Sequence, residues 1–403
     1  MSDTEQSTSN AVRAAGWIFI LLFLFLIAEL FSFAAIRMVP QLRLRTYSSP
    51  AVSEVDYATY LDQRNPELGW PSKGWLASFT DQDGARLSPE NDRLAAEPVC
   101  VSLFGDSFTF ADEVDDVSAW GNVLAGKLGC RVANFGVGGF GTDQAVLRLE
   151  RKLSDGVDIG RSVILAVFPD DLNRTVNGWR YLVGGDPLGF KPMFVATENG
   201  YELQPVFDGS YAEYQSMAAD PTNLMSADQY LPGSPGFKRQ TFVGFPYSLT
   251  LLRILRGEYA AIRSFGAPSS NFWNYPGYFD TPGGPSEEKI ATNQYVIARF
   301  LNVCEQHVLN CAVMLIPDPE MVYQTREIGT HTLGWIMDGV PETTPTFDAS
   351  EAFRDVDDIC RSLTRPDECQ GHFDAGGNER LAKFVAGQFG DSILKEVGLS
   401  PMK

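Results

Sequence analysis

The hydrophobic positions of this chain follow two patterns. Residues 14–36 are almost wholly apolar, and a helix needs about 20 such residues to cross a bilayer. Further along, short apolar runs alternate with stretches whose apolar residues recur at helical spacing. Continuous short runs are typical of buried parallel strands. We expect strands over residues 101–104, 131–135, 162–168 and 311–316, and helices over residues 117–128, 142–153, 286–303 and 378–389.

This alternation predicts the fold class and the domain organisation. Strands that alternate with helices indicate a three-layer α/β fold, a doubly wound parallel sheet with right-handed crossovers. The folded domain should cover residues 99–395, preceded by a linker and edge segment over residues 39–98. Residues 175–284 form an insertion rich in Pro, Gly and aromatic residues, with a hairpin signal at Asn199-Gly200 and a helical pattern over residues 247–257. The insertion either roofs an active site or has only a packing role.

The apolar run near the N-terminus predicts a transmembrane signal anchor over residues 14–38, after a disordered polar tail over residues 1–13. The run is too long for the apolar region of a cleaved signal peptide, and no small-x-small motif follows it closely. Glu29 lies inside the run. An acidic residue there is either a functional group that meets a membrane partner, or one that reaches the interface by extending its side chain.

Arginines and cysteines give opposite indications for topology. Arg13 precedes the helix and three arginines follow it, so the positive-inside rule would place the domain in the cytoplasm. The six cysteines, however, fall into three sequence pairs, which favours disulfides and an oxidising compartment, although reduced buried thiols would also fit. We give the cysteines more weight and expect a single-pass inner-membrane protein with its domain in the periplasm. The expected pairs are Cys100–Cys130, Cys304–Cys311 and Cys360–Cys369.

Composition narrows the possible partners. The 403-residue chain has a net charge of −19 and is 44% hydrophobic, as expected for a folded acidic protein. Nucleic acid phosphates would be repelled by this charge, so we expect no nucleic acid partner.

The candidate chemistry begins at Ser107, which follows Gly105 at the end of the first expected strand. Open α/β sheets place their reactive groups at the carboxyl ends of strands, although Asp and Ser are also common in plain turns. A serine nucleophile needs a base. His307 is expected at the wrong edge of the sheet, and His331 has no acid nearby in sequence. His372 precedes the last helix in an expected turn at the same edge as Ser107, so it is the candidate base.

Two further segments follow the next two strands. Residues 134–141 are rich in glycine, and a glycine loop can direct a backbone N–H at a developing oxyanion. Residues 168–174 contain Asp170, Asp171 and Asn173 after the third strand. These segments and Ser107 would line one crevice.

Together these segments resemble the SGNH or GDSL hydrolase superfamily, in particular its membrane-anchored bacterial branch. Gly105-Asp106-Ser107-Phe108-Thr109 is similar to the first block of that family, with Ser107 as nucleophile and as oxyanion donor through its own N–H. Residues 134–139 are similar to the second block, which places Gly139 at the oxyanion glycine.

The later blocks depart from the family pattern. Asp170 stands where the family has an asparagine, so Asp170 would have to be protonated to donate to an oxyanion, or Asn173 would take that role. The acid that the family places just before the histidine is missing. Asp367 and Glu368 are the candidates to orient His372; otherwise a backbone carbonyl does so.

The resemblance implies a flavodoxin-like fold and a cofactor-free acyl-enzyme mechanism. The expected function is a membrane-anchored serine esterase or deacylase that acts on an acyl ester of a carbohydrate or a lipid. Two alternatives stay open: an O-acyltransferase with the same acyl-enzyme, and a non-catalytic membrane-anchored binding or assembly subunit.

Overall fold

A five-stranded parallel sheet forms the centre of the molecule. The computed structural model describes residues 2–43, 45–232, 240–264, 286–329 and 333–399. The strand order is β2-β1-β3-β6-β7, and every neighbouring pair is parallel. The strands are β1 (Val99–Phe104), β2 (Arg131–Asn134), β3 (Ser162–Val167), β6 (Asn310–Leu315) and β7 (Thr346–Asp348).

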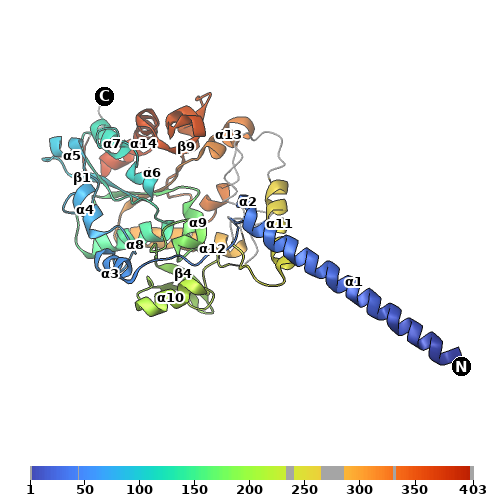
Figure 1. The fold of residues 1–403 in the computed structure, drawn as a ribbon. Coiled ribbons are helices and arrows are strands. Elements are labelled where there is room, and N and C mark those ends of the chain that lie inside the picture. The colour runs from blue at the N-terminus through green and yellow to red at the C-terminus, as the bar shows by residue number, and fades with distance from the viewer. Residues whose placement is uncertain (1, 44, 233–239, 265–285, 330–332, 400–403) are drawn as a thin grey trace.

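Helices cover both faces of this sheet (Figure 1). Because successive strand side chains point to opposite faces, Leu103 joins the core beneath α7 and α14, whereas Phe104 joins the core beneath α8 and α12. Both faces are therefore apolar, and the three-layer α/β arrangement is confirmed. The covering helices are α7 (Trp120–Leu128), α14 (Ala375–Glu396), α8 (Thr142–Ser154) and α12 (Glu287–Gln306).

The C-terminal third holds strands that the sequence analysis did not predict. β7 has three residues, and β8 (Leu363–Arg365) pairs with β9 (Gln370–Phe373) in a hairpin just before α14. Strands this short do not show the alternation of apolar and polar residues by which a strand is predicted from sequence. His372 consequently lies in β9, not in a turn. Further short helices in the described residues are α2 (Pro40–Arg43), α3 (Glu54–Gln63), α4 (Lys73–Phe79), α5 (Pro89–Arg93), α6 (Ser107–Phe110), α9 (Asp171–Thr175), α13 (Pro319–Ile328), η1 (Arg180–Val183), η2 (Gly334–Met337), η3 (Ala349–Phe353), η4 (Ile359–Ser362) and η5 (Pro366–Glu368).

The insertion contributes a second, aromatic core. Its hairpin, β4 (Met193–Thr197) with β5 (Gly200–Gln204), forms at the predicted Asn199-Gly200 turn, and it is followed by α10 (Tyr211–Ala219) and α11 (Tyr247–Ser264). Trp179 stacks on Phe190 with ring centroids 5.6 Å apart, and Tyr214 of α10 stacks on Tyr57 of α3. The aromatic residues of this part of the insertion therefore pack it against the segment over residues 39–98.

The N-terminal helix α1 (Ser2–Met38) projects away from the domain (Figure 1). It begins at Ser2, where the sequence predicts a disordered tail. Within the described residues it is the one helix long and apolar enough to cross a membrane, over Arg13–Met38. By length and composition it could be a membrane anchor or a signal sequence.

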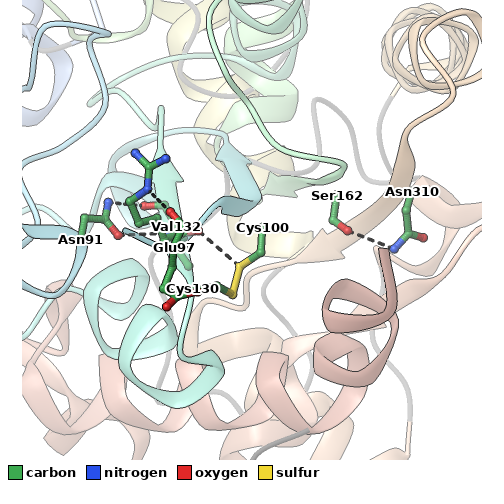
Figure 2. Close-up of a disulfide and its surroundings, with 8 residues drawn as sticks. Asn91, Glu97, Cys100, Cys130, Val132, Ser162 and Asn310 are labelled. Carbon is green, nitrogen blue, oxygen red and sulfur yellow. Dashed lines mark hydrogen bonds between the residues drawn. A yellow bond between two sulfur atoms is a disulfide. The ribbon is translucent and has the colours of Figure 1, made fainter. Parts of the chain in front are cut away.

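All three predicted disulfides are present, and the described residues contain no free cysteine. Cys100–Cys130 joins the amino ends of β1 and β2 with a Cα–Cα distance of 6.0 Å (Figure 2). Beside it, the Asn91 side chain donates to the Val132 carbonyl at 2.8 Å and accepts from the Val132 N–H at 2.9 Å. Asn91 thus pairs with the backbone N–H and carbonyl groups at the edge of β2 as a neighbouring strand would.

Candidate active site

The turn after β1 holds Ser107 at the start of the short helix α6. Asp106 is the N-cap of this helix, and its side chain accepts from the backbone N–H groups of Phe108 at 2.9 Å and Thr109 at 3.4 Å. A Cβ atom on Gly105 would lie 2.1 Å from Thr109 Oγ1 and 2.6 Å from the Ala166 carbonyl oxygen. Only glycine therefore fits this approach between strand and helix, and the turn presents Ser107 at the carboxyl end of β1.

The glycine loop after β2 lies against Ser107. A Cβ atom on Gly138 would be 4.0 Å from Ser107 Cβ and 2.8 Å from Asp112 Oδ2. The Trp70 indole donates to the Gly138 carbonyl at 2.9 Å. This carbonyl and the Gly139 N–H lie on opposite sides of one trans peptide. Because the carbonyl points toward Trp70, the Gly139 N–H points away from Trp70. Gly139 has φ of 76°, a conformation that glycine adopts without strain.

Two N–H groups of the predicted oxyanion site are open. Among the described residues, neither the Ser107 N–H nor the Gly139 N–H has a hydrogen-bond acceptor. Free backbone donors beside a nucleophile are what a developing oxyanion requires. The first two sequence segments thus come together as expected.

His372 lies over the residue that follows Ser107. Its ring packs on Phe108 with centroids 4.7 Å apart. The Ser107 hydroxyl donates to Asp106 Oδ2 at 3.4 Å, and no hydrogen bond joins Ser107 and His372 in the described part of the chain. Catalytic hydrogen bonds are often long or misaligned without substrate. The catalytic pairing of Ser107 with His372, which lie at the same edge of the sheet, therefore stays a prediction.

The carboxylate next to His372 belongs to Glu113, which the sequence analysis missed. Glu113 Oε1 lies 3.4 Å from His372 Nδ1, a close contact without the alignment of a hydrogen bond. Glu113 Oε2 accepts from the His372 backbone N–H at 3.3 Å and from the Thr364 hydroxyl. The Thr364 hydroxyl and then the His372 N–H hold the pKa of Glu113 below its usual value. The group facing His372 is therefore ionised at neutral pH.

Glu113 reaches this position through a backbone conformation that non-glycine residues seldom adopt. Its φ is 69°, which costs free energy and tends to occur at functional sites. The sequence signal that was available is its separation of six residues from Ser107, because an acid so soon after the nucleophile has to lie near the same edge.

Asp367 and Glu368, which were predicted to orient His372, lie elsewhere. Both belong to η5, and both are exposed. Glu368 contacts Arg365 at 3.8 Å. No contact joins either carboxylate to His372 among the described residues, so the contact expected of them is not formed. The carboxylate beside His372 is that of Glu113.

Asp112 and Asp106 add two more carboxylates around the imidazole. Burial raises the pKa of Asp112, while the nearby His372 opposes this shift. Burial likewise raises the pKa of Asp106, against the charges of Arg174 and His372. Both aspartates thus lie close enough to His372 to interact with its ring electrostatically.

The segment after β3 is held by one arginine. Arg174 Nη2 lies 2.9 Å from Asp170 Oδ2, and Arg174 Nη1 lies 3.0 Å from Asp171 Oδ1 and 3.3 Å from Asp106 Oδ2. Burial lowers the pKa of Arg174, but these carboxylates together raise it above its usual value, so it stays charged. An Asp170 ion-paired in this way is an acceptor, which does not fit the expected role of a protonated oxyanion donor.

Hydrogen bonds from the insertion and from α12 fix the orientation of the Asn173 amide. Its Oδ1 accepts from Tyr230 of the insertion at 2.6 Å and from Lys289 of α12 at 2.7 Å, and all three side chains are buried. The Nδ2 group is left as the donor, 3.5 Å from Asp170 Oδ1. A role for Asn173 toward the oxyanion stays a prediction.

The remaining histidines do not join this site. His307 caps the C-terminus of α12, before β6 and therefore at the opposite edge of the sheet. His331 lies outside the described residues. Within the described residues, no group of three or more His, Cys, Asp or Glu side chains is arranged to hold a metal ion.

Comparisons with known proteins give a distant structural likeness. No family model matches the chain, and no curated protein matches it. A solved structure of a protein from Desulfitobacterium hafniense DCB-2, described as a lipolytic protein of the G-D-S-L family, matches 71% of this chain and 97% of its own, with 11% identity and a TM-score of 0.33. Values this low do not assign the chain to that family.

Proposed function

We propose that the protein is a membrane-anchored serine esterase or deacylase. The observation that carries this proposal is the joint position of the Ser107 hydroxyl, the two open N–H groups of Ser107 and Gly139, and the His372–Glu113 contact at one edge of the sheet. A hydrolase needs a nucleophile, a base held by an acid, and an oxyanion site in one place.

The proposed reaction proceeds through an acyl-enzyme. Ser107 Oγ attacks the ester carbonyl while His372 takes its proton, and the N–H groups of Ser107 and Gly139 stabilise the oxyanion. His372 then returns the proton to the departing alcohol. Water then attacks the acyl-enzyme carbonyl while His372 takes its proton. His372 returns this proton to Ser107 Oγ as the bond to the acyl group breaks, and the carboxylic acid leaves. Glu113 acts as a positioning residue that stabilises the imidazolium.

We further propose an acyl ester of a carbohydrate or a lipid as substrate. This class comes from the sequence resemblance alone.

The proposed location is the inner membrane, with the domain in the periplasm. Glu29, Ser32 and Ile36 of α1 are buried against the rest of the chain, which supports a retained anchor, because a cleaved leader has no need to pack in the fold. The three disulfides support an oxidising compartment.

A fluorophosphonate probe and p-nitrophenyl acetate test the function on the full chain in membranes. We expect the probe to label the wild type and the Ser78→Ala control, whose substituted serine is exposed on α4, and not Ser107→Ala. Ester hydrolysis should be lost in the same variant. Equal hydrolysis by wild type and Ser107→Ala would reject the esterase and leave the non-catalytic subunit. If added acceptor glycan suppresses release of free acid, the activity is an O-acyl transfer.

A further inference from the structure

The insertion helix α11 begins beside α1 at a point well inside the apolar run. Glu29 of α1 accepts from the Tyr247 N–H, the Ser248 N–H and the Ser248 hydroxyl, at the first turn of α11. Phe33 packs on Tyr247 with ring centroids 5.0 Å apart. Phe25 meets Phe245, just before α11, at 5.9 Å. Residues more than 200 positions apart thus meet along one side of α1, as the adjacent helices in Figure 1 show.

This contact gives Glu29 a partner within its own chain. A buried carboxylate needs hydrogen bonds, and only 4% of Glu29 is exposed. The first turn of an α-helix has unpaired N–H groups and the positive end of the helix dipole. The 18-residue helix α11 therefore supplies what Glu29 requires. Glu29 therefore has hydrogen-bond partners without a second protein. The expected membrane partner near Glu29 stays a prediction.

The start of α11 lies at hydrocarbon depth if α1 crosses a bilayer. Arg37 marks the polar end of the apolar run and is eight residues after Glu29, which is about 12 Å along a helix. Phe245 and Tyr247 lie at the level of Phe25 to Phe33. The apolar layer is about 30 Å thick, so the first turn of α11 falls within the half nearer the domain.

The outward face of α11 has the composition of a lipid-facing surface. Thr250 and Ile254 are buried against the chain, whereas the apolar residues of the opposite side are exposed. Arg253 and Arg256 are also exposed, and they lie further along α11 from the Glu29 contact. The exposed apolar residues, which continue the exposed apolar surface of α1, are Phe245, Leu249, Leu252 and Leu255.

We propose that α11 is a second membrane-inserted element whose Phe245, Leu249, Leu252 and Leu255 contact acyl chains of the leaflet nearer the domain. Arg253 and Arg256 extend from this face toward lipid phosphates, as long basic side chains do at interfaces. The occupant is lipid and not a protein, because this surface is continuous with the one by which α1 would meet the bilayer. The domain is then held by two membrane contacts and has a fixed orientation above the surface.

Depth-dependent quenching tests this placement on the full-length protein in phosphatidylcholine–phosphatidylglycerol vesicles. A single cysteine at Leu252→Cys carries a fluorophore, since all six native cysteines are paired. Leu22→Cys in α1 is the buried-in-lipid reference, and Val308→Cys, in the turn between α12 and β6, is the aqueous reference. Acyl-chain nitroxides should quench the Leu252 label several-fold more than the Val308 label, and aqueous iodide should quench it several-fold less.

Each other outcome overturns the proposal. If the Leu252 label behaves like the Val308 label while the Leu22 label is quenched from lipid, α11 lies in water. If the Leu252 label is protected from both quenchers, a protein covers the face. If the Leu22 label is also not quenched from lipid, α1 does not span and the basis of the proposal fails. None of these outcomes depends on ester hydrolysis.

The Glu29 contact has its own variant. Glu29→Leu removes the acceptor and keeps α1 apolar, so we expect the lipid quenching of the Leu252 label to fall at least twofold. Glu29→Gln, which keeps one carbonyl acceptor, should retain most of it. Unchanged quenching in Glu29→Leu would show that Glu29 does not hold α11 in place.

Discussion

Replacement of Glu113 by glutamine is the most direct test of the candidate site. Glu113→Gln keeps the shape of the side chain and removes its charge. The charge faces His372 Nδ1 at 3.4 Å, and in the proposed reaction His372 becomes an imidazolium in the transition state. We therefore expect kcat for ester hydrolysis to fall with little change in KM, because the lost interaction strengthens only when the proton is on His372.

The distance and the exposure set the expected size of this effect. Two unit charges at 3.4 Å interact by about 1 kcal/mol in bulk water and by about 5 kcal/mol at an effective dielectric constant of 20. The Glu113 and His372 side chains are 39% and 20% exposed, so solvent screens part of the interaction. We expect a loss of about 2–3 kcal/mol, which is roughly a 30- to 160-fold decrease in kcat.

Glu368→Gln and Asp367→Asn are the matched controls, since each removes an exposed carboxylate from the turn before β9. Both should keep kcat within about twofold, in line with the small effects of exposed charges. Thr364→Val removes a hydrogen bond to Glu113 but leaves the charge, so it should lower kcat less than Glu113→Gln does. Full activity in Glu113→Gln, or an equal loss in Glu368→Gln, would refute the assignment of Glu113.

Three further predictions concern stability. Arg174→Met leaves the buried carboxylates of the segment after β3 without their cation, and chemical unfolding should show a loss of about 3–5 kcal/mol. Removal of the Cys100–Cys130 disulfide, with a sequence separation of 30, should cost about 3–4 kcal/mol, against about 2–3 kcal/mol for Cys304–Cys311, with a separation of 7. Asp112→Asn should raise the melting temperature at pH 7, because burial raises the pKa of Asp112 and the folded state therefore disfavours its charge. This gain should vanish below about pH 4, where the aspartate is protonated both folded and unfolded.

For each of the three stability predictions, one result would contradict the physical reason given for it. A stable Arg174→Met variant would mean that the three aspartates are not held charged around Arg174. A larger loss from the shorter disulfide loop would contradict the loop-entropy argument. A lower melting temperature of Asp112→Asn at pH 7 would mean that this carboxylate has a favourable partner.

The sequence was sufficient for those parts of the fold whose signals are local. Strands β1, β3 and β6 are mostly apolar runs, β2 contains the short apolar pair Val132-Ala133, and the helices between them keep helical spacing. The disulfide pairs follow from cysteines that sit at the ends of neighbouring elements. Ser107 and the glycine-rich segment over residues 134–141 were placed together because parallel strands bring their carboxyl ends to one edge, whereas Gly139 within that segment came from the resemblance to the GDSL family.

The rest depends on contacts between distant segments. Glu113 meets His372 through a left-handed residue and the β8–β9 hairpin, neither of which has a periodic signal. Glu29 meets α11 across a separation of 218 residues. The pairing of Asp170 with Arg174, by contrast, has a local signal, because residues four apart on a helix are neighbours.

The position of two disulfides matters to anyone who engineers this protein. Cys100–Cys130 joins the amino ends of β1 and β2, and Cys304–Cys311 joins the end of α12 to the amino end of β6, so both lie away from the rim that carries Ser107. Loops at that rim can therefore be exchanged or randomised while these two crosslinks stay intact. The hairpin that carries His372 is the exception, because Cys360–Cys369 lies next to it, and a library there should keep both of those cysteines.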